Sequence, residues 1–379
     1  KYLYSFDGQN NARFSSSKTA FPAYPLLPFQ SSDTLIEAWC HTVAPRGSLH
    51  LNLPFNTVVR PLNPQSYPDM DKAIIELHFD SNHGTEVPNS QNMSQIRDFV
   101  KLDVKFDQEI AKMNVAATTI PGVTIPMVCM MWIPLQSDLT ASVLSNSNLT
   151  VEKLEGNSLD LSAQQGTCYL KNLKCGSLNV QCSAGDIISQ STMLGNIVFH
   201  AGACGGILAD KLQGSSVVCQ TEMGNIHVKS MYTDTAVMGT LAGSIKLGQC
   251  HGKMTVQGGR SDVEVGSMEG DVDIGLNQGS VNLYLSRHSN SSIDVEDGNI
   301  SLSFPDGVQT DLKLDCSHVN LGNNVTLEST NTDVPNQLKG YIGQTGLASV
   351  QARTRSGTIA VSQRSWIQST NLNFQQDES

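Results

Sequence analysis

The sequence has few charged residues, few aromatic residues and no long apolar run. Charged residues make up 16% and aromatic residues 6% of the 379 residues, whereas about a quarter of an average soluble domain is charged. This composition argues against a helical bundle. The most apolar stretch, residues 125–135, contains Pro126 and Pro134 and is shorter than the roughly 18 residues that a transmembrane helix needs. We therefore expect no transmembrane helix.

The sequence also lacks the motifs of the common site classes. A net charge of -11 without a basic stripe argues against nucleic acid as the main partner. The 9 cysteines include no CxxC pair, which argues against a zinc ribbon or a thioredoxin-like site and favours reduced, partly buried thiols. No histidine pair has metal-ligand spacing, and no P-loop, dinucleotide fingerprint or GxSxG motif is present. We predict no catalytic residue, no metal and no cofactor.

One short phrase recurs instead: Gly, a small polar residue, an aliphatic residue, any residue, and a second aliphatic residue. Clear copies begin at Gly176, Gly195, Gly224, Gly243, Gly252, Gly270, Gly279 and Gly298, and weaker copies lie between them. The starts form two sets, and within each set most steps are 18 to 20 residues. The repeat unit therefore has about 19 residues and contains the phrase twice.

The phrase predicts a β-strand because its two aliphatic positions are two residues apart and point to one face. Two strands and two turns make one flat coil, and coils stacked about 4.8 Å apart would align their inward side chains in ladders. We predict an all-β, single-stacked β-solenoid with about 19 residues and two strands per coil. The alternative is an antiparallel β-sandwich with a hairpin every ten residues or so.

The flanking segments differ from the repeat. Residues 1–37 read as a flexible leader, and their Ser content with Lys1, Arg13 and Lys18 against Asp7 is typical either of the remnant of a mitochondrial transit peptide or of a plain linker. Residues 38–135 read as a β-rich region that caps the first coil. We assign residues 136–327 to the solenoid, and residues 328–379 to a last coil, with the phrase copy at Gly357, and a polar tail.

Several of these phrases carry a resemblance to known proteins. Trp132-Ile-Pro134, Leu149-Thr-Val151, Leu154-Glu-Gly156 and the copies up to Leu302 resemble an adhesin-like domain family of unknown function, a β-solenoid family common in bacteria. The motif is structural. The segments 53–62 and 67–71 also resemble the vertebrate family with sequence similarity 185. That resemblance implies a mitochondrial location, with a cytoplasmic one as the alternative, and brings no known activity.

The positions between the inward residues suggest one candidate surface. They are apolar in the early coils, at Ile188, Val198, Leu208 and Val217, and polar in the later coils, at positions such as His227, Lys246 and Glu264. Apolar residues that point outward need a cover. We expect residues 38–135 to cover them, and the alternatives are an unknown protein partner or self-association. Lys246 and Glu264 should be neighbours and form a surface ion pair.

A second candidate surface is a set of carboxylates, Asp271, Asp273 and Asp294. Such a cluster would suit acid and base chemistry on a carbohydrate, but any solenoid also needs solvated polar faces. The few aromatic residues of the repeat form no row on which sugars could stack. We therefore predict a non-enzymatic interaction scaffold, with a carbohydrate-binding or carbohydrate-acting solenoid as the alternative.

Overall fold

The computed structural model describes residues 34–80, 100–107, 112–119, 126–322, 325, 328–330, 337–346 and 348–364, and these contain 24 β-strands. The strands are β1 (Leu35–Thr42), β2 (Ser48–Leu53), β3 (Asn56–Pro61), β4 (Lys72–Phe79), β5 (Val100–Asp107), β6 (Lys112–Thr119), β7 (Met127–Ile133), β8 (Asp138–Val143), β9 (Leu149–Glu152), β10 (Ser158–Ala163), β11 (Cys168–Cys182), β12 (Ile187–Ala201), β13 (Ile207–Thr221), β14 (Ile226–Glu269), β15 (Val272–Gln278), β16 (Val281–Arg287), β17 (Asn290–Asp297), β18 (Ile300–Phe304), β19 (Thr310–Asp315), β20 (His318–Leu321), β21 (Glu328–Thr330), β22 (Gln337–Ile342), β23 (Ser349–Ser356) and β24 (Thr358–Gln363).

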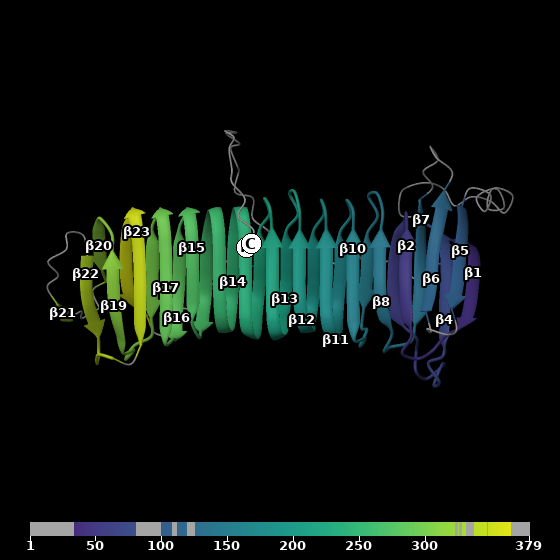
Figure 1. Ribbon diagram of the computed structural model, residues 1–379, viewed down its shortest axis with the longest axis horizontal. Helices are drawn as coiled ribbons and strands as arrows, with labels where there is room; N and C mark the ends of the chain where they lie inside the picture. The colour runs from purple at the N-terminus through teal and green to yellow at the C-terminus, as the bar shows by residue number, and fades with distance from the viewer. Residues whose placement is uncertain are drawn as a thin grey trace, which may run out of the picture.

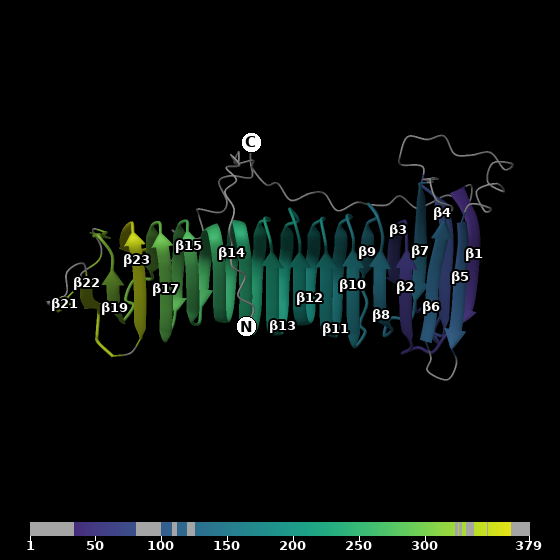
Figure 2. The ribbon, with the colours of Figure 1, turned by 45° about the horizontal axis from the view of Figure 1, so that its top comes forward.

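The strands wind into a stack of flat coils, which confirms the predicted β-solenoid (Figure 1). Successive coils pair in parallel, so that Leu159 lies opposite Leu178, and Leu178 opposite Ile197. The 44-residue β14 turns through successive coils without a break. Each coil contributes one strand to each of two facing sheets, which form the two layers of the rod (Figure 2).

We call these layers sheet I and sheet II. Sheet I contains, in spatial order, β6, β2, β8, β10, the second halves of β11–β13, part of β14, β15, β17, β23 and β19. Sheet II contains β7, β3, β9, the first halves of β11–β13, other parts of β14, β16, β18, β24 and β20.

One continuous core fills the space between the sheets. Inward side chains stack in ladders, as Ile187, Ile207 and Ile226 do, and each of these three is no more than 1% exposed. A ladder of this kind removes apolar surface from water at every coil, at roughly 25 cal/mol per Å². The ladders therefore stabilise the stack through contacts between neighbouring coils.

The first two positions of the phrase lie at the corners, and contacts with the adjacent coil explain both. A Cβ at Gly298 would clash with the carbonyl oxygen of Gly279, so only glycine fits there. The polar residue after the glycine bridges two coils. Its side-chain oxygen accepts a hydrogen bond from a backbone N–H of the next coil, as Asn225 Oδ1 does from Ser244 N at 2.8 Å.

Each end of the rod contains a coil that is out of sequence order. Strands β2 and β3 lie between the coil of β6 and β7 and the coil of β8 and β9, although they precede both in the chain. At the other end, β23 and β24 are inserted between β17–β18 and β19–β20. The phrase copy at Gly357 is therefore the last coil in the chain but not in space, and a Cβ at Gly357 would clash with the carbonyl oxygen of Gly298.

Antiparallel strands extend both ends beyond the parallel coils. β4 pairs with β7 and β1 pairs with β4, while β5 pairs with β6. At the other end, β22 pairs with β19 and β21 with β22. Nearly all of the predicted leader lies outside the described residues, and β1 begins at Leu35. None of the described residues forms a helix that is long and apolar enough to cross a membrane.

Candidate interaction surface

The outer face of sheet II carries one column of mainly apolar side chains over its first six rungs, which we call the apolar stripe. In spatial order, the stripe consists of Met130, Val58, Thr150, Tyr169, Ile188 and Leu208, each opposite the next in the strand register. The inward ladder beside it takes the alternate positions. The stripe thus joins residues of β3 and β7 to residues of the repeat.

Polar side chains continue the same column beyond Leu208. They are His227, Lys246, Glu264 and Asn282. Lys246 Nζ lies 3.3 Å from Glu264 Oε2, which confirms the predicted ion pair. Burial lowers the pKa of His227, and the positive charges of Lys246 and Lys229 lower it further. One face of the rod therefore changes from apolar to charged along its length.

Four of the six stripe residues are unusually buried for an outer face, and Tyr169 and Leu208 are half-buried. Val58 is 1%, Thr150 4% and Ile188 4% exposed. At the same height on the opposite face, Asp160 is exposed, and Asn179 and Val198 are only half-buried. Every described strand is a rung or an antiparallel extension of sheet I or sheet II, so none of them lies over the stripe.

Polar side chains line the stripe on both sides. On one side Arg60 Nε lies 3.0 Å from Glu152 Oε2, and both residues are half-buried. On the other side Asn148 accepts a hydrogen bond from the backbone N–H of Thr167 at 2.8 Å. An apolar centre with a polar rim is the usual anatomy of a surface that binds a polypeptide.

The four apolar residues that the sequence suggested as one outward surface do not lie on one face. Ile188 and Leu208 belong to the stripe, but Val198 lies on the outer face of sheet I, where it pairs with Val218. The outward assignment of Val217 is wrong: this residue is 0% exposed and lies in the core opposite Ile197. Two serines after Gly214 shift the phrase by one position, so Val218 takes the outward place.

The expected cover is also different. The described strands of residues 38–135 form two coils and an end cap, rather than a layer over Ile188. Sequence reasoning missed Val58, Met130 and Tyr169 as members of the stripe. Val58 and Met130 come together only because β3 and β7 pair across a long sequence separation, and no local pattern signals that pairing.

The three carboxylates do not converge. Asp271 Oδ1 accepts hydrogen bonds from the backbone N–H groups of Ser289 and Asn290, at 2.7 and 2.9 Å, and so closes a corner. Asp273 is exposed beside Ser292, and Asp294 lies one coil further on, opposite Arg353. An acid and a base that act on one glycosidic bond must flank it from opposite sides. The three residues instead share a corner and an outer face with solvated neighbours.

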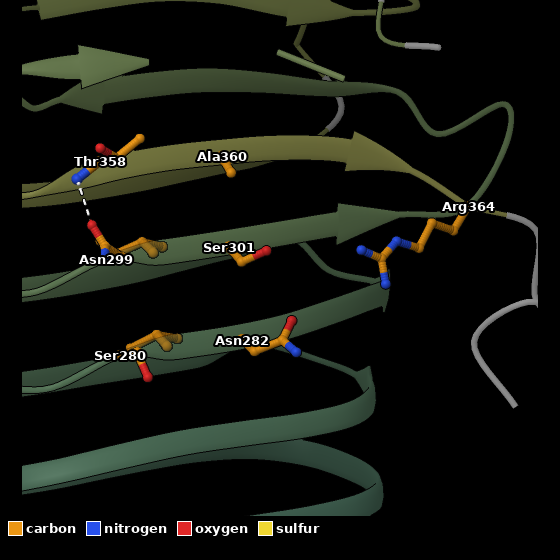
Figure 3. Close-up of a pocket in the computed structure, with 9 residues that line it drawn as sticks. Ser280, Asn282, Asn299, Ser301, Thr358, Ala360 and Arg364 are labelled. Carbon is orange, nitrogen blue, oxygen red and sulfur yellow. Dashed lines mark hydrogen bonds between the residues drawn. The ribbon is translucent and has the colours of Figure 1, made fainter. Parts of the chain in front are cut away.

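A shallow hollow lies over β16, β18 and β24 on the same face as the stripe (Figure 3). Its floor is formed by the small side chains of Asn282, Ser301 and Ala360, and Arg364 stands at one end. Asn299 Oδ1 accepts a hydrogen bond from Thr358 N at 2.9 Å in its wall. The hollow offers neutral polar groups and one guanidinium, a set that suits weak contacts with a polar ligand. Within the described part of the chain, no group of three or more His, Cys, Asp or Glu side chains could hold a metal ion.

Part of the chain matches a known family model. Residues 188–362 match the family model Toastrack DUF4097. The Toastrack match begins in β12 and ends in β24, so it includes the inserted last coil. Most of the apolar stripe, from Met130 to Tyr169, lies outside the Toastrack match. The stripe is therefore a feature that this match does not account for.

Two solved structures are similar to the chain at low identity. One is a proposed cell adhesion protein from Clostridium sporogenes, with 9% identity, a TM-score of 0.20, and coverage of 86% of this chain and 99% of that one. The other is a proposed adhesin from Bacteroides fragilis, with 8% identity, a TM-score of 0.29, and coverage of 86% and 96%.

Proposed function

We propose that this protein is a non-enzymatic scaffold, a rigid rod that binds a polypeptide along the outer face of sheet II. The observation that carries the proposal is the apolar stripe, in which four of six residues are buried and the other two half-buried although no described strand covers them. Contiguous apolar surface on an otherwise polar face marks an interaction site. The polar rims would fix the position of the bound chain.

The rod shape supports a scaffold. Each coil is hydrogen-bonded to its neighbours by in-register parallel pairing, and the core ladder runs without interruption from β2 to β24. Such a stack holds its outer faces in fixed positions, so a partner meets a surface that is already ordered. Binding to an ordered surface loses less conformational entropy than binding to a mobile one.

The test is proximity labelling in cells with the full-length protein, followed by co-purification of the strongest hit. We compare the wild type with Leu208→Asp, which places a charge in the stripe, and with Val198→Asp, which places the same charge on the outer face of sheet I in the adjacent coil. We expect Leu208→Asp to lose the partner and Val198→Asp to keep it. Equal loss or equal retention in both variants would refute the stripe as the binding surface.

We also propose that the protein works in a reducing compartment, the mitochondrial matrix. Its 9 cysteines are all unpaired, which fits a compartment that keeps thiols reduced, and the leader has the composition of a transit peptide. Cell fractionation with a tag at the carboxyl end tests this location, and recovery in the secretory fraction would contradict it. The same proposal includes the resemblance to the vertebrate family with sequence similarity 185, which implies a mitochondrial location.

A further inference from the structure

We propose that the apolar stripe is the docking surface for a proline-rich segment in the polyproline II conformation, and that its resident occupant is residues 21–29 of this chain. These residues are Phe-Pro-Ala-Tyr-Pro-Leu-Leu-Pro-Phe, a run without a single charge or polar amide. They lie outside the described residues. Every member of the run is apolar or aromatic, so it matches the chemistry of the stripe.

The first support is where the chain enters the described structure. Thr34 is 4% exposed, and its Oγ1 lies 3.1 Å from His78 Nδ1. His78 pairs with Val128 and points to the outer face of sheet II. The chain that precedes Thr34 therefore starts on the face that carries the stripe, next to its Met130 end. No crossing from one sheet to the other is needed.

The second support is length. A polyproline II helix rises about 3.1 Å per residue, so the run spans about 28 Å. The stripe covers six rungs, from Met130 to Leu208, and five steps of about 4.8 Å give about 24 Å. The run and the stripe therefore have nearly the same length when the run lies along the axis of the rod.

The third support is that the spacing of the prolines in the run matches the spacing of the rungs in the stripe. Pro22, Pro25 and Pro28 recur every third residue, which is one turn of a polyproline II helix. One turn advances about 9.3 Å, close to two rung spacings of about 9.6 Å. Side chains on one edge of the helix would therefore meet every second rung of the stripe. Tyr169 within the stripe, and Trp132 beside Met130, supply the aromatic surfaces that such segments favour.

The fourth support is hydrogen bonding. A ligand on the outer face of a sheet finds no free backbone groups there, because the rungs already pair with one another. Proline lacks the N–H group, and a polyproline II segment keeps its carbonyl groups directed to water. Pro22, Pro25 and Pro28 therefore bring no N–H group to this face, and the polyproline II backbone leaves its other polar groups solvated.

The proposal that residues 21–29 occupy the apolar stripe rests on this geometry alone. The effect of that occupancy on partner binding rests on the proposed function. If a partner binds the same stripe, residues 21–29 compete with it from within the molecule. A tethered segment acts at an effective concentration near the millimolar range. The partner would then have to displace the segment, or to present a proline-rich run of its own.

A cross-linking experiment on the full chain tests the occupancy. Cys40 and Cys204 are exposed and are first replaced by serine. Phe21→Cys is then combined with Leu208→Cys, its expected neighbour, or with Val198→Cys on the outer face of sheet I in the adjacent coil. Mild oxidation should give an intramolecular disulfide in the first pair and not in the second. The proposal is overturned if neither pair links, if both link equally, or if the first pair links only between two molecules.

A binding experiment on the full chain gives an independent measure. A labelled peptide of residues 19–31 is titrated into the wild type and into a variant with Phe21→Ser, Tyr24→Ser and Leu27→Ser. Because the tethered run covers the stripe in the wild type, we expect the peptide to bind the variant at least about tenfold more tightly. Equal affinity for both proteins would overturn the proposal. If Leu208→Asp loses the cellular partner but the cross-link does not form, the proposed function stands and residues 21–29 are not the occupant. If the cross-link forms but Leu208→Asp keeps the cellular partner, residues 21–29 are the occupant and the proposed function is refuted.

Discussion

At the scale of single residues, the corners of the coils decide which side chains are tolerated. A corner glycine faces a backbone carbonyl of the adjacent coil, and this leaves no room for a Cβ. The polar residue after it holds the next coil through a hydrogen bond, as Asp262 does with Ser280 N at 2.9 Å. The same phrase thus specifies a steric requirement and a bridge, both repeated from coil to coil.

Replacing a corner glycine should be far more damaging than replacing a glycine on an open face. Gly298 has a φ of +153° and faces the carbonyl oxygen of Gly279, whereas an added Cβ at Gly275 has nothing within 4 Å. We expect Gly298→Ala to lower the free energy of unfolding by about 2–4 kcal/mol and Gly275→Ala to change it by less than about 1 kcal/mol. Urea denaturation followed by circular dichroism measures both, and similar losses would contradict the steric account.

The buried thiols should make stability fall at alkaline pH. Burial raises the pKa of Cys129, Cys219 and Cys250 from 9.0 to about 12. Their contribution is present in full below pH 9 and is lost as the pH rises toward 12, because only the unfolded chain ionises in that window. Each thiol adds a slope of up to about 1.4 kcal/mol per pH unit. Urea denaturation from pH 8 to 10 should show a shallower slope for Cys219→Ala than for the wild type, and equal slopes would contradict this.

At the scale of elements, the inserted coils set which strands depend on which. β20 pairs only with β24 among the described strands, although β24 follows it by a long stretch of chain. Ser303 Oγ and Ser362 Oγ, 2.9 Å apart, link β18 to the same inserted coil. The end of the rod is therefore held together by a segment that the chain supplies last.

Removing that segment should release strands that remain in the chain. In a protein that ends at residue 348, we expect the backbone amides of β20, and those of β18 that face β24, to lose their protection from hydrogen exchange, because β24 is their shared neighbour while β18 keeps β16 on its other side. The amides of β10 and β11, far from this end, serve as the internal control and should stay protected. Mass spectrometry of exchanged peptides measures both regions. Full protection of β20 would show that it can pair directly with β18.

At the scale of the whole molecule, the exposed edges of the two sheets must not pair with other molecules. β5 pairs only with β6 among the described strands, and its outward positions are Lys101, Asp103 and Lys105. Lys105 Nζ lies 2.7 Å from Asp103 Oδ2. Charged side chains on an edge strand oppose the addition of a further strand. The rod therefore ends in a strand that discourages stacking end to end.

Neutralising this edge should promote self-association. We expect Lys101→Val with Lys105→Val to form dimers or longer species at micromolar concentration, detected by sedimentation velocity. The matched control is Lys229→Val with Lys246→Val, which removes the same charge from the interior of β14, where each rung already has a neighbour on both sides. Association of the control alone, or of neither protein, would contradict the protective role of β5.

The repeat made the coil predictable, because each copy of the phrase carries its own turn, its own inward pair and its own bridge. Lys246 and Glu264 could be paired from their spacing for the same reason. The inserted coils were not predictable, since β3 finds β7 and β18 finds β24 across segments without any repeat. Val217 was misplaced because Val217, Val218 and Cys219 form an apolar run in which the sequence alone does not mark the inward members. Predicting the apolar stripe would have required both the strand register of sheet II and the insertion of β3 between β7 and β9.

The inserted coil of β23 and β24 has a consequence for synthesis on the ribosome. The chain emerges from its amino end, so β17 to β22 are made before the coil that separates them exists. The edges of β17–β18 and of β19–β20 that will face the inserted coil then stay unpaired until residue 363 has been made. A nascent chain that stalls in this window would be recognised by its open edges, and folding chaperones would have their clearest task before β24 has been made.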